Sequence, residues 1–194
     1  MREIARGAEA VLYEHKDTII KHRLKKTYRL KELDDELRKQ RTRKEARLLE
    51  KIPILHPALI HSDNKEKIVM QKIKGEKLRE VLDKKPELAK KIGELVTEIH
   101  NHEIIHGDLT TSNMILNKEG KIVFIDFGLS FHSHKIEDKA VDIHLFKQAL
   151  NSKHHQVYDK ALKAFLEGYK KVNKYQEILK RLGKVEMRGR YRKE

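Results

Sequence analysis

The stretch His106-Gly107-Asp108-Leu109-Thr110-Thr111-Ser112-Asn113 decides the fold. An aspartate followed five residues later by an asparagine places a carboxylate and an amide on one loop. There Asp108 can orient a hydroxyl group or a water molecule, and Asn113 can bind Mg²⁺. The stretch therefore predicts a loop that serves phosphoryl transfer.

A second motif, Ile125-Asp126-Phe127-Gly128, lies eighteen residues after Asp108. The apolar run that precedes it predicts a strand that ends at Asp126, whose carboxylate would bind the nucleotide metal. Phosphoryl transfer requires such a metal because its barrier is mostly charge on phosphate oxygens. A lone Asp-Phe-Gly tripeptide is a weak signal, but its combination with the first motif at this separation is specific.

Upstream residues supply the expected phosphate-binding pair. Lys21, in Ile19-Ile20-Lys21, has the form of a strand lysine that holds the α- and β-phosphates. Glu45, in a predicted helix, is expected to pair with Lys21. Glu32, Glu36 and Glu50 lie on the same helix and remain alternatives. Taken alone, Lys21 could equally be a surface lysine.

A phosphate-binding loop is expected between the opening residues and the first strand. The segment from Ile4 to Ala10 fits by position, and we expect Ile4, Gly7, Ala8, Glu9 and Ala10 to contact the nucleotide. The segment has a single glycine where many kinases have three, but one glycine still permits close approach of the backbone. The Gly-Ala-Glu-Ala sequence alone would mean little.

Composition narrows the function classes further. The chain has twelve histidines but neither a cysteine nor a His-Glu-x-x-His pattern, which argues against a transition-metal site and excludes disulfides. His106 is instead expected to support the loop that carries Asp108. No signal peptide and no membrane-spanning run is evident, so the sequence indicates a soluble, cytoplasmic protein with no membrane partner.

Positive charge is concentrated in two segments. The formal net charge is +14. Residues 21–51 hold thirteen Lys and Arg against six Asp and Glu, and residues 180–194 hold seven against two. A single basic run is often only a solvated surface, but two such runs in a phosphate-handling protein favour a polyanionic partner.

The order of predicted elements indicates an α+β, two-lobed protein-kinase-like fold with a reduced C-terminal lobe. Strands are expected over 9–14, 18–21, 59–61 and 68–73, with a helix over 31–51 among them. A break at Gly75 separates an N-terminal lobe (1–74) from a helical C-terminal lobe (75–184). In that second lobe we expect Val157, Leu162, Phe165, Leu166 and Tyr169 in the core. Residues 185–194 are expected to form a basic, flexible tail outside the fold.

Together these motifs resemble the small protein-kinase subunit of the KEOPS (EKC) complex, the p53-related protein kinase family. The resemblance covers essentially the whole chain and rests on these stretches: Gly7–Ala10, Ile-Ile-Lys-His-Arg around Lys21, Thr-Arg-Lys-Glu-Ala-Arg-Leu-Leu around Glu45, the Asp108 and Asp126 motifs, and the terminal Met-Arg-Gly-Arg. RIO kinases and aminoglycoside phosphotransferases share the His-Gly-Asp feature but lack the Ile-Lys-His-Arg and Met-Arg-Gly-Arg features.

The resemblance implies an atypical Ser/Thr kinase with Mg²⁺-dependent ATPase activity, within an assembly that installs threonylcarbamoyl on adenosine 37 of tRNAs reading ANN codons. Carried over, Asp108 would be the catalytic acid/base, and Asn113 and Asp126 the Mg²⁺ ligands. ATP would be held by the Lys21–Glu45 pair and the Gly7 loop. The implied partners are the threonylcarbamoyl-transferase subunit, a small regulatory subunit at the N-terminal lobe, and tRNA through the basic surface and C-terminal tail.

The sequence departs from ordinary protein kinases in two ways. Gly107 replaces the arginine that docks a phosphorylated activation loop. Asp138 follows only ten positions after Gly128, with no Ala-Pro-Glu motif after it. Both departures favour ATP hydrolysis in a complex over peptide phosphorylation. A pseudokinase-like scaffold and a stand-alone, RIO-like or small-molecule phosphotransferase remain alternatives; the intact Asp108, Asn113, Asp126 and Lys21 argue against the scaffold.

Overall fold

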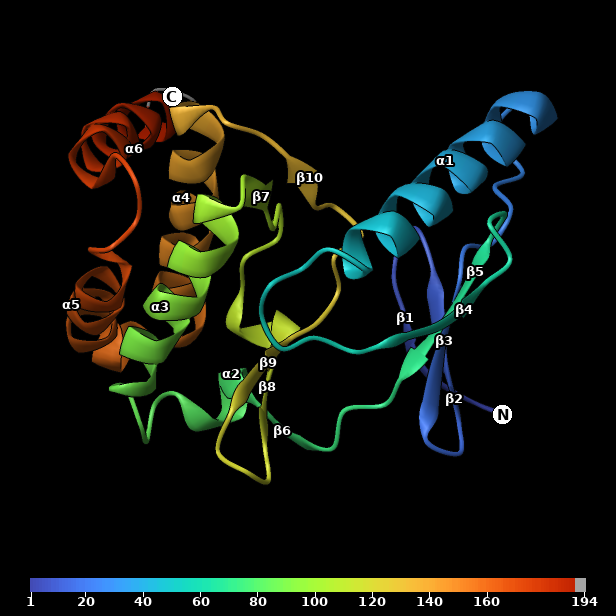
Figure 1. Ribbon diagram of the computed structural model, residues 1–194, viewed down its shortest axis with the longest axis horizontal. Coiled ribbons are helices and arrows are strands. Elements are labelled where there is room, and N and C mark those ends of the chain that lie inside the picture. Colours follow the sequence, from blue (N-terminus) through green and yellow to red (C-terminus); the bar gives the residue numbers. More distant parts are fainter. Residues whose placement is uncertain (191–194) are drawn as a thin grey trace. The chain divides into compact units, whose positions relative to one another are not determined.

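The computed structural model describes residues 1–190, which form two compact units (Figure 1). The first unit consists of residues 1–52 and 56–73. The second consists of residues 53–55 and the chain from residue 74 onward. The division after residue 73 lies next to the predicted break at Gly75. Gly75 itself, however, begins a strand of the second unit instead of a loop.

A five-stranded antiparallel sheet forms most of the first unit, in the order β1-β2-β3-β5-β4. Its strands are β1 (Arg2–Arg6), β2 (Val11–His15), β3 (Thr18–His22), β4 (Leu59–Ser62) and β5 (Lys67–Gln71). Lys21 lies in the central strand, opposite Leu12 on one side and Ile68 on the other. The four predicted strands are confirmed as β2 to β5, while β1 was missed because all five of its residues are exposed.

Helix α1 (Lys31–Leu49) completes the first unit, and its buried face is unusually polar. Leu48 and Leu49 are buried as expected from their spacing, whereas Leu30 is 76% exposed and Leu33 is 53% exposed. Asp34, Thr42 and Glu45 are buried in their place. A helix that buries charged groups must provide partners for them. Those partners come from β3, from the segment between β3 and α1, and from α1 itself, where Arg38 pairs with Asp34 at 2.9 Å.

The second unit combines helices with short strands. Its elements are β6 (Gly75–Lys77), α2 (Leu78–Val81), α3 (Leu88–Asn101), β7 (Ile104–Ile105), the 3₁₀ turn η1 (Thr111–Asn113), β8 (Met114–Asn117), β9 (Ile122–Phe124), β10 (Phe131–His132), α4 (Ile136–Lys153), the 3₁₀ turn η2 (His155–Val157), α5 (Tyr158–Tyr169) and α6 (Tyr175–Arg190). Strands β6, β8 and β9 form one antiparallel sheet, and β7 pairs with β10.

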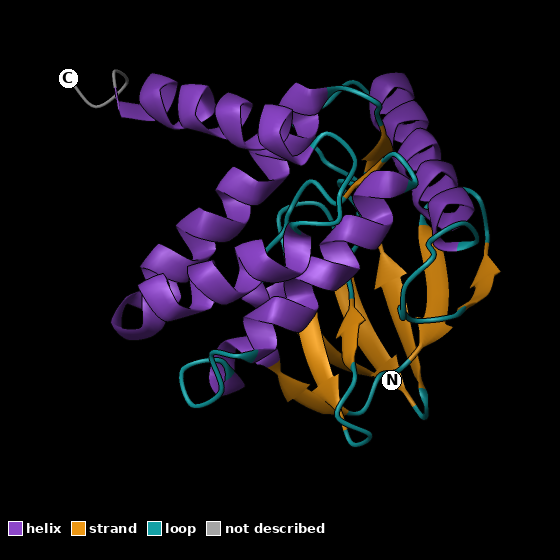
Figure 2. Ribbon diagram, turned by 60° about the vertical axis from the view of Figure 1, so that its left-hand side comes forward, coloured by secondary structure: helices purple, strands orange, loops and turns teal. Residues whose placement is uncertain are grey.

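The core of the second unit lies among its long helices, which gather in one group (Figure 2). The ring of Phe165 lies 4.5 Å from that of Phe146 and 5.7 Å from that of Tyr169, measured between centroids. Helices α3 and α5 approach so closely that a Cβ atom added at Gly93 would lie 2.1 Å from the Phe165 carbonyl oxygen. The predicted core residues Phe165 and Tyr169 are fully buried, but Leu162 and Leu166 are only partly buried.

The expectation of a flexible tail from Val185 onward is wrong for residues 185–190. Those residues continue helix α6, which buries Ile178 and Leu182 and contacts α4. The apolar spacing of Ile178, Leu182 and Val185 is helical and extends past the predicted boundary. Arg188 also pairs with Glu137 of α4 at 2.7 Å. Residues 191–194 of the predicted tail lie outside the described residues.

The predicted α+β class is confirmed by this mixture of an antiparallel sheet and helices. Among the described residues, none of the helices is both long enough and apolar enough to cross a membrane.

Candidate active site

The predicted pair between Lys21 and Glu45 forms in the first unit. The Nζ atom of Lys21 lies 2.8 Å from Oε1 of Glu45, and the two side chains are 10% and 2% exposed. The alternatives Glu32, Glu36 and Glu50 are all exposed. The helical register therefore selects Glu45 as the one acidic residue of this group that is buried and reaches Lys21.

A second cation, Arg23, shares Glu45 and was missed by the sequence argument. Its Nη2 atom pairs with Oε2 of Glu45, and its Nη1 atom donates to the hydroxyl of Thr42 at 3.3 Å. Arg23 is 3% exposed. Alternation offered a signal, since Arg23 follows Lys21 by two residues and such residues share a face of a strand. The result is a buried cluster in which one carboxylate is held by two cations.

The Gly7 loop joins β1 to β2 and is tied to the segment that leads into α1. The Gly7 N–H donates to the carbonyl of Ala10 at 2.9 Å. The Lys26 ammonium donates to the carbonyl of Ala8. Glu9 pairs with Arg29 at 3.3 Å and also with Arg41 of α1. Ile4, predicted to contact the nucleotide, lies in β1 and is 42% exposed.

Asp108 and Asn113 come together in the second unit. The Nδ2 atom of Asn113 donates to Oδ2 of Asp108 at 2.8 Å and to the Asp108 carbonyl at 3.0 Å. The backbone N–H of Ile125 donates to the Asn113 carbonyl at 2.9 Å. Asp126 is the next residue, so all three predicted residues of this unit are connected through Asn113.

The backbone at Asp126 adopts an uncommon conformation. Its φ angle is +61°, a left-handed value that few residues other than glycine adopt. The Asp126 carboxylate is exposed, and its Oδ1 atom accepts a hydrogen bond from the Gly128 N–H at 3.3 Å. Backbone strain of this kind persists where the surrounding structure imposes it and is concentrated at functional sites. The predicted strand does end just before this residue, at Phe124.

Asp142 of α4 anchors the segment that leads to Asp108. It is fully buried, and its carboxylate accepts hydrogen bonds from the backbone N–H groups of His106 at 2.8 Å and Gly107 at 2.9 Å. The Nε2 atom of His100 lies 3.1 Å from the same carboxylate, and its Nδ1 atom lies 2.6 Å from the hydroxyl of Tyr169.

The surroundings of Asp142 and His106 shift the pKa of each side chain. Burial would raise the pKa of Asp142, but the hydrogen bond and charge of His100, together with the His106 N–H, hold it below its ordinary value. Burial lowers the pKa of His106. This shift favours the neutral form of the His106 ring, whose centroid lies 5.0 Å from that of Phe127.

Gly107 cannot be exchanged for another residue at the same backbone conformation. Its φ angle is +80°, and an added Cβ atom would lie 2.5 Å from the carbonyl oxygen of Leu129. An arginine in this position would require the backbone to move. The presence of glycine in place of the arginine of ordinary protein kinases therefore has a structural reason.

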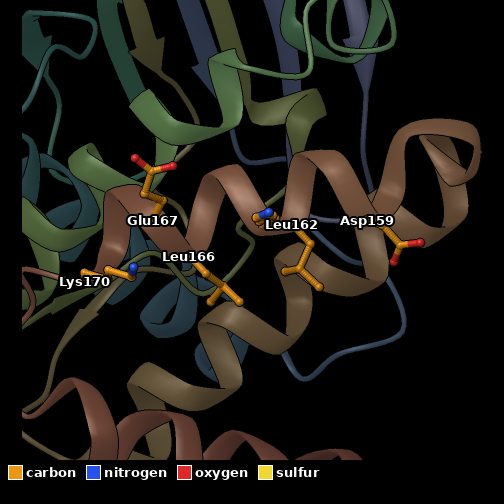
Figure 3. Close-up of a pocket in the computed structure, with 6 residues that line it drawn as sticks. Asp159, Leu162, Leu166, Glu167 and Lys170 are labelled. Atoms are coloured by element: carbon orange, nitrogen blue, oxygen red, sulfur yellow. The ribbon is translucent and has the colours of Figure 1, made fainter.

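A hollow on the second unit is lined by residues of α5 and by Lys170, which follows that helix (Figure 3). The lining residues of α5 are Asp159, Leu162, Lys163, Leu166 and Glu167. Its lining carries both signs of charge and none of the predicted site residues. Among the described residues no three histidine, aspartate or glutamate side chains gather into a metal site.

Comparisons with known proteins agree with the family resemblance that the motifs indicate. The family model described as RIO domain matches residues 12–140. The KEOPS complex subunit Bud32 of Pyrococcus abyssi is 40% identical and aligns with 99% of this chain and 97% of its own length. The EKC/KEOPS complex subunit BUD32 of Enterocytozoon bieneusi is also 40% identical, over 97% of this chain and 98% of its own length.

A second group of relatives is longer. A probable bifunctional tRNA threonylcarbamoyladenosine biosynthesis protein of Methanocaldococcus jannaschii is 43% identical over 97% of this chain. The match covers 36% of that protein. The chain thus spans about a third of the length of such bifunctional relatives and nearly all of the length of the Bud32 subunits.

Proposed function

Since the chain belongs to the RIO domain family and to the family of KEOPS complex subunits named Bud32, we propose that it is an ATP-hydrolysing, kinase-like subunit of a tRNA-modifying complex. The reaction is Mg²⁺-dependent cleavage of ATP, and the product of the complex is threonylcarbamoyladenosine at position 37 of tRNAs reading ANN codons.

One observation carries the enzymatic part of the proposal. Asn113 is hydrogen-bonded through its side chain to Asp108 and through its backbone to the residue before Asp126. A carboxylate to orient a nucleophile, an amide oxygen and a second carboxylate are thereby held in fixed relation. The left-handed backbone at Asp126 is of the kind that is concentrated at functional sites, and Asp142 accepts hydrogen bonds from the segment that leads to Asp108.

The residues present suit Mg²⁺ and a nucleotide. Asn113 uses its Nδ2 atom to hold Asp108, which leaves its Oδ1 atom for a cation, and Asp126 presents an exposed carboxylate. Oxygen ligands of this kind, few in number and completed by phosphate and water, are what Mg²⁺ prefers. When bound, the metal would neutralise charge on the phosphate oxygens.

The roles of the other residues follow from their surroundings. Asp108 would accept a hydrogen bond from the attacking water and orient it. Lys21, positioned by Glu45, would bind the phosphates as a point charge. Gly7 has only ordinary contact in its own chain, since an added Cβ atom would lie 3.6 Å from the Ala10 carbonyl oxygen. Its lack of a side chain would instead serve the close approach of a phosphate to the backbone.

Replacement of Asp126 tests the assignment. Asp126→Ala should abolish Mg²⁺-dependent ATP turnover and shift the thermal unfolding midpoint by no more than a few degrees, because the carboxylate is exposed. Asp159→Ala is the matched control, since Asp159 is an exposed carboxylate on α5. Unchanged hydrolysis in Asp126→Ala, in protein free of contaminating ATPase, would refute the metal assignment.

Transfer of phosphate to a Ser or Thr hydroxyl is the second candidate activity, and it is inferred only from the family. The segment between Gly128 and α4 is short and forms the strand β10, which pairs with β7. No other element between Gly128 and α4 offers a platform for a peptide. We therefore place hydrolysis first. A comparison of phosphate released with phosphate incorporated into protein, from ATP labelled in the γ-phosphate, decides between the two.

The proposed partners are the threonylcarbamoyl-transferase subunit of the KEOPS complex, a small regulatory subunit on the first unit, and tRNA. The bifunctional relatives support the first partner, because this chain matches 36% of a longer protein of tRNA threonylcarbamoyladenosine biosynthesis, and functions joined in one chain are expected to work side by side. For tRNA, Arg43 and Arg47 lie one turn apart on α1 and are both exposed. Other arginines of the same basic run, such as Arg38, are engaged by carboxylates within the unit.

Salt dependence tests the tRNA surface. Each phosphate contact contributes about 0.7–0.9 to the slope of log K against log salt. The double variant Arg43→Gln/Arg47→Gln should therefore reduce the slope by about 1.4–1.8. Lys163→Gln/Lys170→Gln, which removes the same charge from α5 and the residue after it, should leave the slope unchanged. Equal slopes for both double variants and the parent protein would exclude the α1 surface.

A further inference from the structure

Three side chains that take no part in the proposed ATP hydrolysis form a chain of hydrogen bonds in the second unit. The Nδ1 atom of His154 lies 2.7 Å from Oδ1 of Asp83, and its Nε2 atom lies 2.9 Å from the hydroxyl oxygen of Thr111. Asp83 follows helix α2, His154 ends helix α4, and Thr111 begins the turn η1. Residues distant in the sequence thus converge on the segment that contains Asp108 and Asn113.

The donors and acceptors in this chain of hydrogen bonds follow from the chemistry of the three side chains. A carboxylate can only accept a hydrogen bond, so the proton of a neutral His154 ring resides on Nδ1, facing Asp83. In that tautomer the Nε2 atom has a lone pair and accepts a hydrogen bond from the Thr111 hydroxyl. His154 is 1% exposed and Thr111 is also 1% exposed. Removal of either partner would leave a buried polar atom without a hydrogen bond.

The order Asp-His-Thr is also that of a hydrolase triad, but burial excludes that interpretation. The Thr111 side chain is enclosed, so its oxygen cannot reach a substrate. Its position in the chain indicates a different role, because Thr111 lies three residues after Asp108 and two before Asn113. Thr110 makes no side-chain capping bond to the turn, so the Thr111 hydroxyl, through His154, gives the middle of this segment a side-chain anchor in addition to the backbone bonds at His106, Gly107 and Asn113.

We propose that Asp83 and His154 are positioning residues that hold Thr111 and thereby set the geometry of Asp108 and Asn113. This inference rests on the proposed ATP turnover. Asp83 fixes the tautomer of His154, His154 fixes the Thr111 hydroxyl, and the turn η1 carries that constraint to the Asn113 amide that binds Asp108. Neither Asp83 nor His154 touches the reacting groups.

Substitution of Thr111 tests the positioning role in turnover. Thr111→Val keeps the shape and removes the hydroxyl, and kcat for ATP should fall about tenfold to a hundredfold, the scale expected from small misplacement of reacting groups. KM for ATP should stay within about twofold of the parent because the loss lies in the reacting geometry. Thr111→Ser restores the hydroxyl and should recover kcat to within about threefold.

Thr97→Val is the matched control. Thr97 is a buried threonine of α3 whose hydroxyl donates to the Gly93 carbonyl at 2.9 Å. Its loss should lower the thermal unfolding midpoint while kcat stays unchanged. If Thr111→Val behaves like Thr97→Val, or if Thr111→Ser does not recover kcat, the positioning role is overturned.

Two further measurements keep the inference testable if Thr111→Val does not fold. The side chain of Asp83 is 52% exposed, so Asp83→Ala should fold normally and lower kcat about three- to tenfold with KM unchanged. The ¹⁵N resonances of the His154 ring report its tautomer directly. They should show a protonated Nδ1 atom and an unprotonated Nε2 atom in the parent, and a change in that population in Asp83→Ala.

The outcomes separate this inference from the proposed function. An unprotonated Nδ1 atom in the parent, or unchanged kcat in Asp83→Ala, overturns the role of Asp83 and His154 alone. Absence of ATP turnover in the parent overturns the proposed function, and the positioning role with it.

Discussion

Replacement of Asp142 by asparagine is the change whose effect can be worked out most fully from the structure. Asparagine has the shape of aspartate but replaces one oxygen by an NH₂ group and removes the charge. With its oxygen in the position of Oδ2, it keeps the bonds to the His106 N–H and to His100. Its NH₂ group then faces the Gly107 N–H, so two donors meet where a hydrogen bond of 2.9 Å existed.

The expected cost follows from these contacts. The part-buried Gly107 N–H loses a charge-assisted hydrogen bond and gains no other partner, a loss worth about 1.5–3 kcal/mol. We therefore expect Asp142→Asn to lower the free energy of unfolding by about 1.5–3 kcal/mol. A domain is stable by about 5–15 kcal/mol, so the variant should remain folded at 25 °C.

Urea denaturation as a function of pH measures the effect. The pKa of Asp142 lies below its ordinary value, so its stabilising contribution is fully present above about pH 4 and is lost as the pH falls through the folded-state pKa. The difference in unfolding free energy between the parent and Asp142→Asn should be constant near pH 7 and shrink below about pH 4.

Asp159→Asn provides the control, since it makes the same chemical change at an exposed carboxylate. It should change stability by less than about 0.5 kcal/mol. A difference of that size for Asp142→Asn, or a larger effect that does not depend on pH between 3 and 7, would show that Asp142 does not anchor the loop as a charged group.

The remaining predictions concern the two halves of the proposed chemistry. Asp108→Ala should reduce kcat about a hundredfold or more while ATP affinity, measured by calorimetry, changes little; a collapse of affinity would make Asp108 a binding or folding residue. Arg23→Met should lower the free energy of unfolding by about 1–3 kcal/mol in urea denaturation, because Glu45 loses one of its two cations and Thr42 its donor. No loss of stability would mean that Lys21 alone satisfies Glu45.

The sequence predicts those site residues that lie close together in the chain or on regular helices and strands. Asp108 and Asn113 are close in the chain, and Asp126 follows a short strand that pairs with β8, so spacing alone brings these residues together. Lys21 and Glu45 are further apart, yet the strand and the helix that carry them are both regular. Three other glutamates on the helix were alternatives, and only burial separates them from Glu45.

Residues that act from a distance were not predictable in the same way. Asp142 lies 34 residues after Asp108 in a helix that has acidic and basic residues on several sides, and no local pattern marks it. His154 and Asp83 are likewise not marked by any local sequence pattern. Their roles arise only when the helices pack, because hydrogen bonds between side chains of separate elements leave no periodic signature in the sequence.

The errors in the fold have similarly specific causes. Strand β1 has no buried residue, so its pairing with β2 depends on backbone hydrogen bonds that composition does not reveal. The end of α6 was judged by its charge, although Ile178, Leu182 and Val185 continue a helical spacing and Glu137 pairs with both Arg181 and Arg188. Charge density therefore predicted a tail where ion pairs in fact stabilise a helix.

ATP turnover by the purified protein, measured alone and then with the threonylcarbamoyl-transferase subunit and tRNA, tests the central claim most directly. We predict Mg²⁺-dependent hydrolysis by the protein alone and a change in its rate when the partner and tRNA are added. A scaffold would show no hydrolysis in either case, and a stand-alone phosphotransferase would show turnover that neither addition alters. Either of those results would contradict the proposed function.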